Sequence, residues 1–198
     1  MIKIIDYKAG NAPSVLHAVE RLGFKAELTA DPEGLENASR IILPGVGSAG
    51  ATMSSLRESG MADALTEYAI NRRILFLGVC VGLQILFEHS EEDDAFCFGW
   101  LKGKVKKFDS NTVRVPQMGW NKVCFINDTP LNAADGYFYF VNSYHAIAED
   151  QNDIWGTAQY GEDFTAAVNR GNIYGTQFHI EKSGEAGLKL LKGFITQC

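Results

Sequence analysis

A cysteine between two glycines carries the clearest chemical signal in this chain. Cys80 lies in segment 77–84, Leu-Gly-Val-Cys-Val-Gly-Leu-Gln, after an apolar run and before apolar residues at helical spacing. Gly-x-Cys-x-Gly at a strand-to-helix turn is the cysteine form of the nucleophile elbow, a strained turn that exposes the nucleophile. The dipole at the start of the following helix favours a thiolate there. The pattern predicts a nucleophile at Cys80, against the alternative of a buried cysteine at an ordinary turn.

A histidine and a glutamate two residues apart supply the base that a thiolate nucleophile needs. They are His179 and Glu181, in segment 176–181, Thr-Gln-Phe-His-Ile-Glu. If His179 ends a strand, Glu181 lies on the same face, because alternate strand residues point the same way. The carboxylate then fixes the tautomer of the imidazole and leaves the other ring nitrogen for Cys80. The alternative is a strand-end histidine beside a solvated acid, which is the commoner case for His-x-Glu alone.

A glycine-rich loop at 44–47, Pro-Gly-Val-Gly, directly follows another apolar run. Glycines let backbone N–H groups turn toward the elbow. Val46 and Gly47 are therefore expected to complete an oxyanion hole with the N–H of Val81. An ordinary turn or a phosphate-binding loop is the alternative. The Walker signature Gly-Lys-Ser/Thr does not follow these glycines, which disfavours a nucleotide site.

The elements that position these motifs differ between the two halves of the chain. In the first half, fully apolar runs such as 41–43 and 74–77 alternate with helical spacing at 13–22 and 61–71, which predicts a parallel sheet covered on both faces. After about residue 96, short strand-like segments separated by Gly, Asn and Asp indicate antiparallel hairpins. A helix at 187–195 closes the chain. The strands expected in this half are 100–108, 121–126, 136–141, 144–148, 154–160, 164–168 and 173–178.

Composition limits the classes of protein that this chain can belong to. Its 198 residues are 46% hydrophobic and 21% charged, as in an ordinary globular protein, and indicate a single domain over residues 1–198. A net charge of -6 disfavours nucleic-acid binding, and no apolar run is long enough to span a bilayer. The N-terminus does not resemble a signal peptide, so we expect a cytoplasmic location. The scattered cysteines and histidines predict neither a disulfide framework nor a metal site.

Taken together, the three motifs resemble those of class I (triad) glutamine amidotransferases. The resemblance spans essentially the whole chain. Three further stretches support it: Asp-Tyr-x-x-Gly-Asn at 6–11, Val-Pro-Gln-Met-Gly-Trp-Asn at 115–121, and Tyr-Phe-Val-Asn-Ser-Tyr at 139–144. It implies an α/β, flavodoxin-like fold, in which a central, mostly parallel sheet is flanked by helices and antiparallel strands are added in the C-terminal half. It also implies that no cofactor takes part.

The resemblance further implies a reaction and the residues that perform it. Cys80 would attack the side-chain amide of glutamine, and His179, oriented by Glu181, would protonate the leaving ammonia. The residues expected to contact bound glutamine are Gly45, Gln84, Glu92 and the main chain of Ser143 and Tyr144. Glu92 stands in an acidic run, and such runs are usually solvated faces.

Members of this family deliver ammonia to a synthase, and here the resemblance implies a heterodimer with a (β/α)8-barrel subunit. The residues expected at the interface or ammonia gate are Asn11, Gln117, Trp120, Asn121, Tyr139 and Lys182. A core position is the alternative for Trp120. Other open hypotheses are a subunit for a different synthase, such as one that amidates a sugar, a cysteine hydrolase that acts alone, and a non-catalytic binding subunit.

The sequence departs from the family pattern near the triad and the gate. Ile180 stands where proline is common, which removes a φ restriction beside the catalytic histidine. Gln117 and Asn142 stand where histidines are common, and Lys8 replaces a usual glycine. None of these differences removes a catalytic group. They bear on the identity of the ammonia acceptor, because gate and interface residues follow the partner.

Overall fold

The computed structural model describes residues 1–7, 11–127, 129–131 and 133–196. Lys8 lies outside the described residues, as do Gly10 of the 6–11 stretch and the terminal Cys198. The hydrophobic core runs through both halves of the sheet, from Ile4 in the first strand to Phe178 near the triad histidine. No helix among the described residues is long and apolar enough to cross a bilayer.

The N-terminal half of the sheet is parallel, as the apolar runs predicted. Its strands lie in the order β2-β1-β3-β4-β13, and each pair of neighbours is parallel. Residues 41–43 and 76–77 are completely buried because helices cover both faces of these strands. The strand bounds are Ile2–Ile5 (β1), Ala26–Thr29 (β2), Arg40–Gly45 (β3), Leu75–Cys80 (β4) and Ile173–Thr176 (β13).

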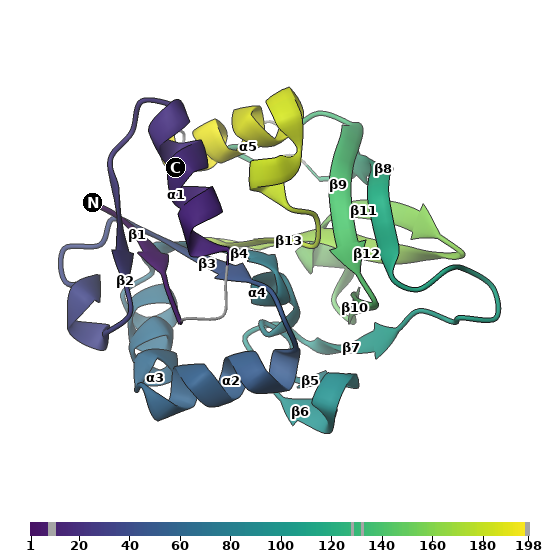
Figure 1. Cartoon of the computed structure of the whole chain (residues 1–198), viewed down its shortest axis with the longest axis horizontal. Coiled ribbons are helices and arrows are strands. Elements are labelled where there is room, and N and C mark those ends of the chain that lie inside the picture. The colour runs from purple at the N-terminus through teal and green to yellow at the C-terminus, as the bar shows by residue number, and fades with distance from the viewer. Residues whose placement is uncertain (8–10, 128, 132, 197–198) are drawn as a thin grey trace.

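Helices lie on both faces of this sheet (Figure 1). Helices α1 (Ala12–Arg21) and α5 (Gly184–Thr196) are on one side, and α2 (Ala49–Glu58) and α3 (Met61–Thr66) on the other. Helix α2 is an addition to the helices predicted from the sequence. Its start is marked by Ser48, whose hydroxyl accepts the N–H of Ala51 at 3.3 Å, an ordinary N-cap contact. The helix expected over 61–71 changes after Thr66 into a π-helical turn, Glu67–Asn71.

The C-terminal half is antiparallel, as expected, apart from the parallel pairing of β5 with β7. Beyond β13 the sheet continues through β12, β10, β7, β5 and β6, and β11 joins β12 to the β8–β9 hairpin. The bounds are His89–Ser90 (β5), Ala95–Phe96 (β6), Gly103–Lys107 (β7), Gln117–Phe125 (β8), Gly136–Asn142 (β9), Tyr144–Ala148 (β10), Ile154–Tyr160 (β11) and Glu162–Arg170 (β12). Short 3-10 turns lie at Pro32–Leu35, Glu92–Asp94, Gln151–Asp153 and Ile180–Lys182.

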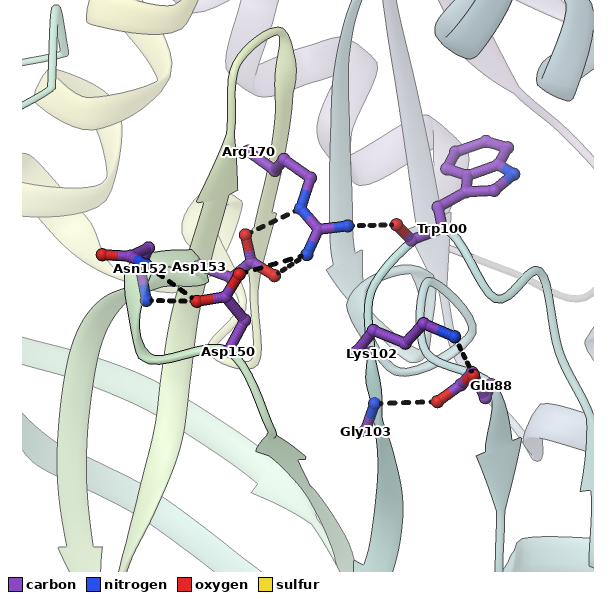
Figure 2. A network of polar contacts seen from close by, with 8 residues as sticks. All are labelled: Glu88, Trp100, Lys102, Gly103, Asp150, Asn152, Asp153 and Arg170. Carbon is purple, nitrogen blue, oxygen red and sulfur yellow. Dashed lines mark hydrogen bonds and ion pairs between the residues drawn. The ribbon is translucent and has the colours of Figure 1, made fainter.

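Strand β7 is shorter than the expected 100–108 because the backbone before it bonds elsewhere. The N–H of Leu101 donates to the carbonyl of Leu86 at 2.9 Å. The carbonyl of Trp100 accepts from Arg170 at 3.0 Å, and the same guanidinium binds the carboxylate of Asp153 (Figure 2). This network fixes the segment before β7 against the end of β12.

The helix after Cys80 is much shorter than its sequence pattern predicted. Helix α4 covers only Val81–Gln84. It ends because the carbonyls of residues 85–87 accept the N–H groups of Phe98, Leu101 and Gly99 at 2.8–2.9 Å instead of continuing the helix. The expected helix dipole at Cys80 is therefore that of a single turn.

Candidate active site

The elbow around Cys80 is built by close packing of glycines. Cys80 has φ 55° and ψ −110°, a conformation that L-residues rarely adopt, at the junction of β4 and α4. A β-carbon on Gly82 would lie 2.1 Å from the carbonyl oxygen of Leu43, and one on Gly78 would lie 2.3 Å from the carbonyl oxygen of Gly82. Neither position tolerates a side chain, and this packing holds the strained turn in place.

His179 and Glu181 form the expected pair, although not through the expected strand. Nδ1 of His179 lies 2.9 Å from Oε1 of Glu181. Strand β13 ends at Thr176, and His179 caps a 3-10 turn over Ile180–Lys182. The strand geometry assumed from the sequence is therefore wrong, and the turn is what makes the contact. The backbone carbonyl of His179 accepts the N–H of Lys182 at 3.1 Å and the hydroxyl of Ser183 at 2.6 Å, and these two hydrogen bonds fix the turn.

Ile180, which stands where the family commonly has proline, leaves the pair intact. Its side chain is completely buried. A β-carbon on Gly187 would lie 2.0 Å from the carbonyl oxygen of Ile180, so α5 packs directly on this turn. Tertiary packing thus restricts the backbone where a proline ring is missing.

The surroundings of His179 favour its protonated form. Burial lowers the pKa of His179, but hydrogen bonding and charge attraction from Cys80 and Glu181 outweigh burial and raise the pKa to about 10. Since the side chains of His179 and Glu181 are only 4% and 1% exposed, water screens this interaction little. At neutral pH the site therefore holds an imidazolium beside Cys80.

A cavity of about 320 Å³ opens in front of this histidine and Cys80. It brings together most of the residues that the sequence singled out, from five separate segments of the chain. Glu181 lies behind the imidazole rather than in the lining. The lining residues are Val46, Gly47, Cys80, Val81, Gln84, Glu92, Pro116, Val141, Asn142, Ser143, Tyr144, His179 and Lys182.

One acid of the run at 91–94 faces this cavity. Glu92 lines it and accepts the N–H of Ala49 at 3.0 Å, while its neighbours in the run are exposed. Burial raises the pKa of Glu92, and the hydrogen bond from Ala49 opposes this rise. The solvated-face alternative therefore does not describe Glu92.

The main chain at Tyr144 is held by side-chain amides. Its carbonyl accepts Nε2 of Gln84 at 2.9 Å and Nδ2 of Asn142 at 2.9 Å. These contacts position the backbone of 143–144 at the cavity wall, where a substrate carboxylate was expected. Gln84 is 3% exposed, and its Nε2 points into the protein at this carbonyl.

The glycine-rich loop reaches the cavity, but its amides are not all directed at Cys80. Val46 and Gly47 line the cavity, with Gly47 at φ +89°. The N–H of Val46, expected in the oxyanion hole, instead donates to the hydroxyl of Tyr7 at 3.3 Å. Gly45 is not part of the lining. A β-carbon on Gly45 would lie 2.4 Å from the backbone nitrogen of Gly82, so this glycine serves close packing of the loop on α4.

The residues expected at a partner interface fall into distinct groups. Trp120 is 55% exposed and packs edge-on against Tyr139, with ring centroids 5.9 Å apart, so it is not a core residue. Lys182 is exposed at the cavity rim. Asn121 points away from Trp120, because alternate strand residues face opposite sides, and its Nδ2 donates to the carbonyl of Gln159 at 2.8 Å.

Gln117 is buried, with 2% of its surface exposed, and neither atom of its side-chain amide has a hydrogen-bond partner within the described residues. It lies opposite Asn142 in the β8–β9 pair. Asn11 contacts the triad itself, because its Nδ2 donates to Oε1 of Glu181. The structure thus brings Asn11 into contact with the triad and leaves Gln117 out of the cavity lining.

Sequence reasoning missed two residues that contact the site, Gln177 and Tyr7. Gln177 is completely buried, and its Nε2 lies 3.7 Å from Sγ of Cys80. A glutamine in the otherwise apolar approach to His179 was a signal for such a contact. Among the described residues, no group of three or more His, Cys, Asp or Glu side chains is placed to hold a metal ion.

The family model for glutamine amidotransferase class-I matches residues 3–198 of this chain. The chain belongs to this family of amidotransferases. A relative from Leptospira interrogans, "Imidazole glycerol phosphate synthase subunit HisH", is 43% identical over 99% of this amidotransferase and 100% of its own length. "Imidazole glycerol phosphate synthase hisHF, chloroplastic" from Arabidopsis thaliana is 41% identical over 98% of this chain but only 34% of the plant protein.

Solved structures agree with the fold of the amidotransferase. A chain of "Structure of PurLQS from Thermotoga maritima" superimposes with a TM-score of 0.79 at 23% identity, covering 98% of this chain and 96% of the other. At this identity the match concerns the fold alone. The α/β class predicted from the sequence, with a parallel half and an antiparallel half, is confirmed.

Proposed function

We propose that this chain is the glutaminase subunit of imidazole glycerol phosphate synthase. In this proposal it acts as one domain and hydrolyses L-glutamine to glutamate and ammonia. A (β/α)8-barrel, HisF-like cyclase subunit then uses the ammonia to make imidazole glycerol phosphate and AICAR in histidine biosynthesis. The observation that carries the proposal is the placement of Cys80 and His179 in one cavity, with Glu181 bonded behind the imidazole.

The first half of the reaction forms a thioester. The thiolate of Cys80 attacks the amide carbon of glutamine, and the carbonyl electrons move to oxygen to give a tetrahedral oxyanion. As the carbon–nitrogen bond breaks, the imidazolium of His179 gives its proton to the leaving nitrogen, which departs as ammonia. The raised pKa of His179 supplies this proton at neutral pH. Glu181 keeps the ring in place throughout.

The second half restores the enzyme. Neutral His179 takes a proton from water, and the resulting hydroxide attacks the thioester carbon. The tetrahedral intermediate collapses and expels the thiolate of Cys80, which releases glutamate with its γ-carboxyl group protonated. That carboxyl group then ionises. The imidazolium–thiolate pair is regenerated, and one water is consumed for each ammonia formed.

Recognition of glutamine uses other residues of the cavity lining. Glu92 supplies a carboxylate for the substrate ammonium group, and the backbone of Ser143 and Tyr144 faces the substrate carboxylate. Val81 and Gly47 contribute N–H groups to the oxyanion hole. Val46 joins them only after its N–H leaves the hydroxyl of Tyr7, so the isolated subunit is expected to hydrolyse glutamine slowly.

Ammonia must leave without being protonated in bulk water, which calls for a partner. The exposed aromatic and apolar side chains of Met118, Trp120 and Tyr137 lie on the β8–β9 hairpin, and Lys182 lies at the rim of the cavity. Such a surface is typical of a protein interface. The Arabidopsis relative supports a permanent companion, since this chain matches only 34% of it. We place the pair in the cytoplasm, where cysteines such as Cys80 stay reduced.

A second proposal is a subunit that supplies ammonia to a different synthase, such as one that amidates a sugar. It shares the glutaminase chemistry with the first proposal and differs from it in the molecule that receives the ammonia. The specific observation in its favour is that Gln117 and Asn142, rather than histidines, form a cross-strand pair beside the cavity.

The deciding experiment measures glutamate released from glutamine by the purified chain, alone and with a histidine-pathway barrel subunit and its ribonucleotide ligand. We expect strong stimulation by the complex and loss of activity in Cys80→Ala with binding of the partner retained. Hydrolysis without stimulation shifts the assignment to another synthase. Substantial activity in Cys80→Ala shows that another residue is the nucleophile.

A further inference from the structure

A completely buried glutamine next to the elbow plays no part in the mechanism described above. Gln177 lies between the end of β13 and the triad histidine, and its backbone N–H donates to the carbonyl of Ala166 at 2.8 Å. Its side chain contacts two polar groups. Nε2 lies 3.7 Å from Sγ of Cys80, and Oε1 accepts Nε2 of Gln84 at 3.1 Å.

The direction of this hydrogen-bond chain is fixed at its far end. The carbonyl oxygen of Tyr144 can only accept, so the atom of Gln84 that lies 2.9 Å from it must be the NH₂ group. The second N–H of that group reaches Gln177, which must therefore turn its oxygen toward Gln84. The NH₂ group of Gln177 is then the atom that faces Cys80, since the oxygen of the same amide is turned toward Gln84.

A donor at this place distinguishes the two ionisation states of Cys80. A thiol can give its own proton to the carbonyl of Val141, which lies 3.9 Å from Sγ, and gains little from an N–H donor. A thiolate is an acceptor, so the N–H of Gln177 stabilises it at a position where Cys80 is only 4% exposed. The single turn of α4 contributes little dipole, which increases the weight of a side-chain donor.

We propose that Gln177 is a positioning residue that stabilises the thiolate of Cys80, and that Gln84 holds its amide in the donating orientation. The inference rests on the proposed glutaminase function and extends it. Through Tyr144, this chain of amides connects the wall expected to bind the substrate carboxylate with the nucleophile. Gln84 therefore acts on Cys80 through Gln177 in addition to lining the cavity.

The test measures the rate of alkylation of Cys80 by iodoacetamide from pH 5 to pH 10 in the full chain, followed on the Cys80 peptide by mass spectrometry. Gln177→Met keeps the length and removes the donor. We expect the pH of half-maximal alkylation to rise and the alkylation rate at pH 7 to fall about tenfold. A hydrogen bond to a charged group stabilises it enough to change the fraction of thiolate by about this factor. Burial raises the pKa of Cys97 to about 11, so that peptide serves as a slow internal reference.

Two further variants separate this role from a structural one. Gln84→Met frees the amide of Gln177 to rotate and should move the profile in the same direction by a smaller amount, which keeps the test available if Gln177→Met does not fold. Thr165→Val is the matched control. Thr165 is 5% exposed and accepts the N–H of Ala148, so its loss lowers stability without touching Cys80.

The alkylation profile distinguishes the possible outcomes. A shift in both glutamine variants and none in Thr165→Val supports the proposal. Unchanged profiles in folded Gln177→Met and Gln84→Met overturn it, as do equal shifts in all three variants. Glutamate release by the wild-type complex is measured separately, so a wild-type protein that alkylates normally but releases no glutamate contradicts the proposed function and leaves the inference on Gln177 standing.

Discussion

Asn11 donates its side-chain N–H to the same oxygen of Glu181 that binds the imidazole of His179. The carboxylate is therefore held from two sides through Oε1, while Oε2 is buried and has no hydrogen-bond partner within the described residues. The family resemblance placed Asn11 at a subunit interface. The structure makes Asn11, which directly precedes α1, a hydrogen-bond partner of the triad carboxylate.

Removing this contact should impair turnover more than stability. In Asn11→Ala the carboxylate loses one of its two anchors, and we expect kcat for glutamine hydrolysis by the complex to fall about tenfold, in line with the loss of one hydrogen bond to a charged group. Asn169→Ala is the matched control, because the side-chain amide of Asn169 donates to the backbone carbonyls of Gly171 and Ile173 rather than to a triad residue. Equal effects of the two variants on kcat would contradict a role for Asn11 in the triad.

The raised pKa of His179 predicts how stability depends on pH. Its folded pKa of about 10 lies above the ordinary value of 6.5, so the folded state binds a proton that the unfolded state releases between these values. The contribution of His179 to the free energy of unfolding is complete below about pH 6.5 and is lost as the pH rises through about 10. Urea unfolding at several pH values should show that the free energy of unfolding falls more steeply with rising pH in the wild type than in His179→Gln. Parallel curves of this free energy against pH would refute the prediction.

The contact between Tyr7 and Val46 predicts a variant with higher basal activity. Tyr7→Phe removes the hydroxyl that accepts the N–H of Val46 at 3.3 Å, which frees this N–H for the oxyanion hole. Burial raises the pKa of Tyr7, so the hydroxyl stays neutral at working pH. We expect several-fold faster glutamate release by the isolated chain and little change in the stimulated complex. A slower isolated chain would show that Tyr7 supports the active loop instead.

The network at the end of β12 predicts a stability change without a catalytic one (Figure 2). Arg170 neutralises Asp153, whose side chain is 4% exposed, so Arg170→Ala leaves a buried carboxylate unpaired. We expect a loss of about 2 kcal/mol in the free energy of unfolding, below the ~3–5 kcal/mol for breaking a fully buried pair because Arg170 itself is 42% exposed.

Lys102→Ala in the same network is the control. Lys102 and Glu88 are 65% and 41% exposed, and an ion pair screened by water in this way contributes little to stability. Chemical unfolding measures both changes, and kcat below the melting range should be unchanged in both variants. A larger loss of stability in Lys102→Ala than in Arg170→Ala would contradict this account of the network.

Much of the fold could be read from local patterns. Residues 41–43 and 74–77 are apolar without alternation, and a strand with this pattern must be covered on both faces. The glycines at 78 and 82 indicated the elbow, because a tight strand-to-helix turn leaves no room for a β-carbon at these two positions. These features depend on residues close together in the chain, and such interactions leave a signal in sequence.

Local sequence patterns could not predict the length of α4 or the turn at His179. Helix α4 stops because carbonyls at 85–87 bond to residues 98–101, and no window of sequence shows that competition. His179 meets Glu181 through a 3-10 turn on which α5 packs, rather than through a strand.

The sequence by itself determined the chemistry that is available: a cysteine in a strained turn, a histidine with its acid, and the alternation of strands and helices that holds them. Only the tertiary structure decided which polar groups face each of them. Asn11 bonds Glu181 across 170 positions of sequence, and Gln177 reaches Cys80 across 97. Hydrogen bonds require atoms within about 3 Å, or somewhat more for sulfur, and correct orientation. Residues so distant in sequence reach that geometry only when the whole sheet has assembled.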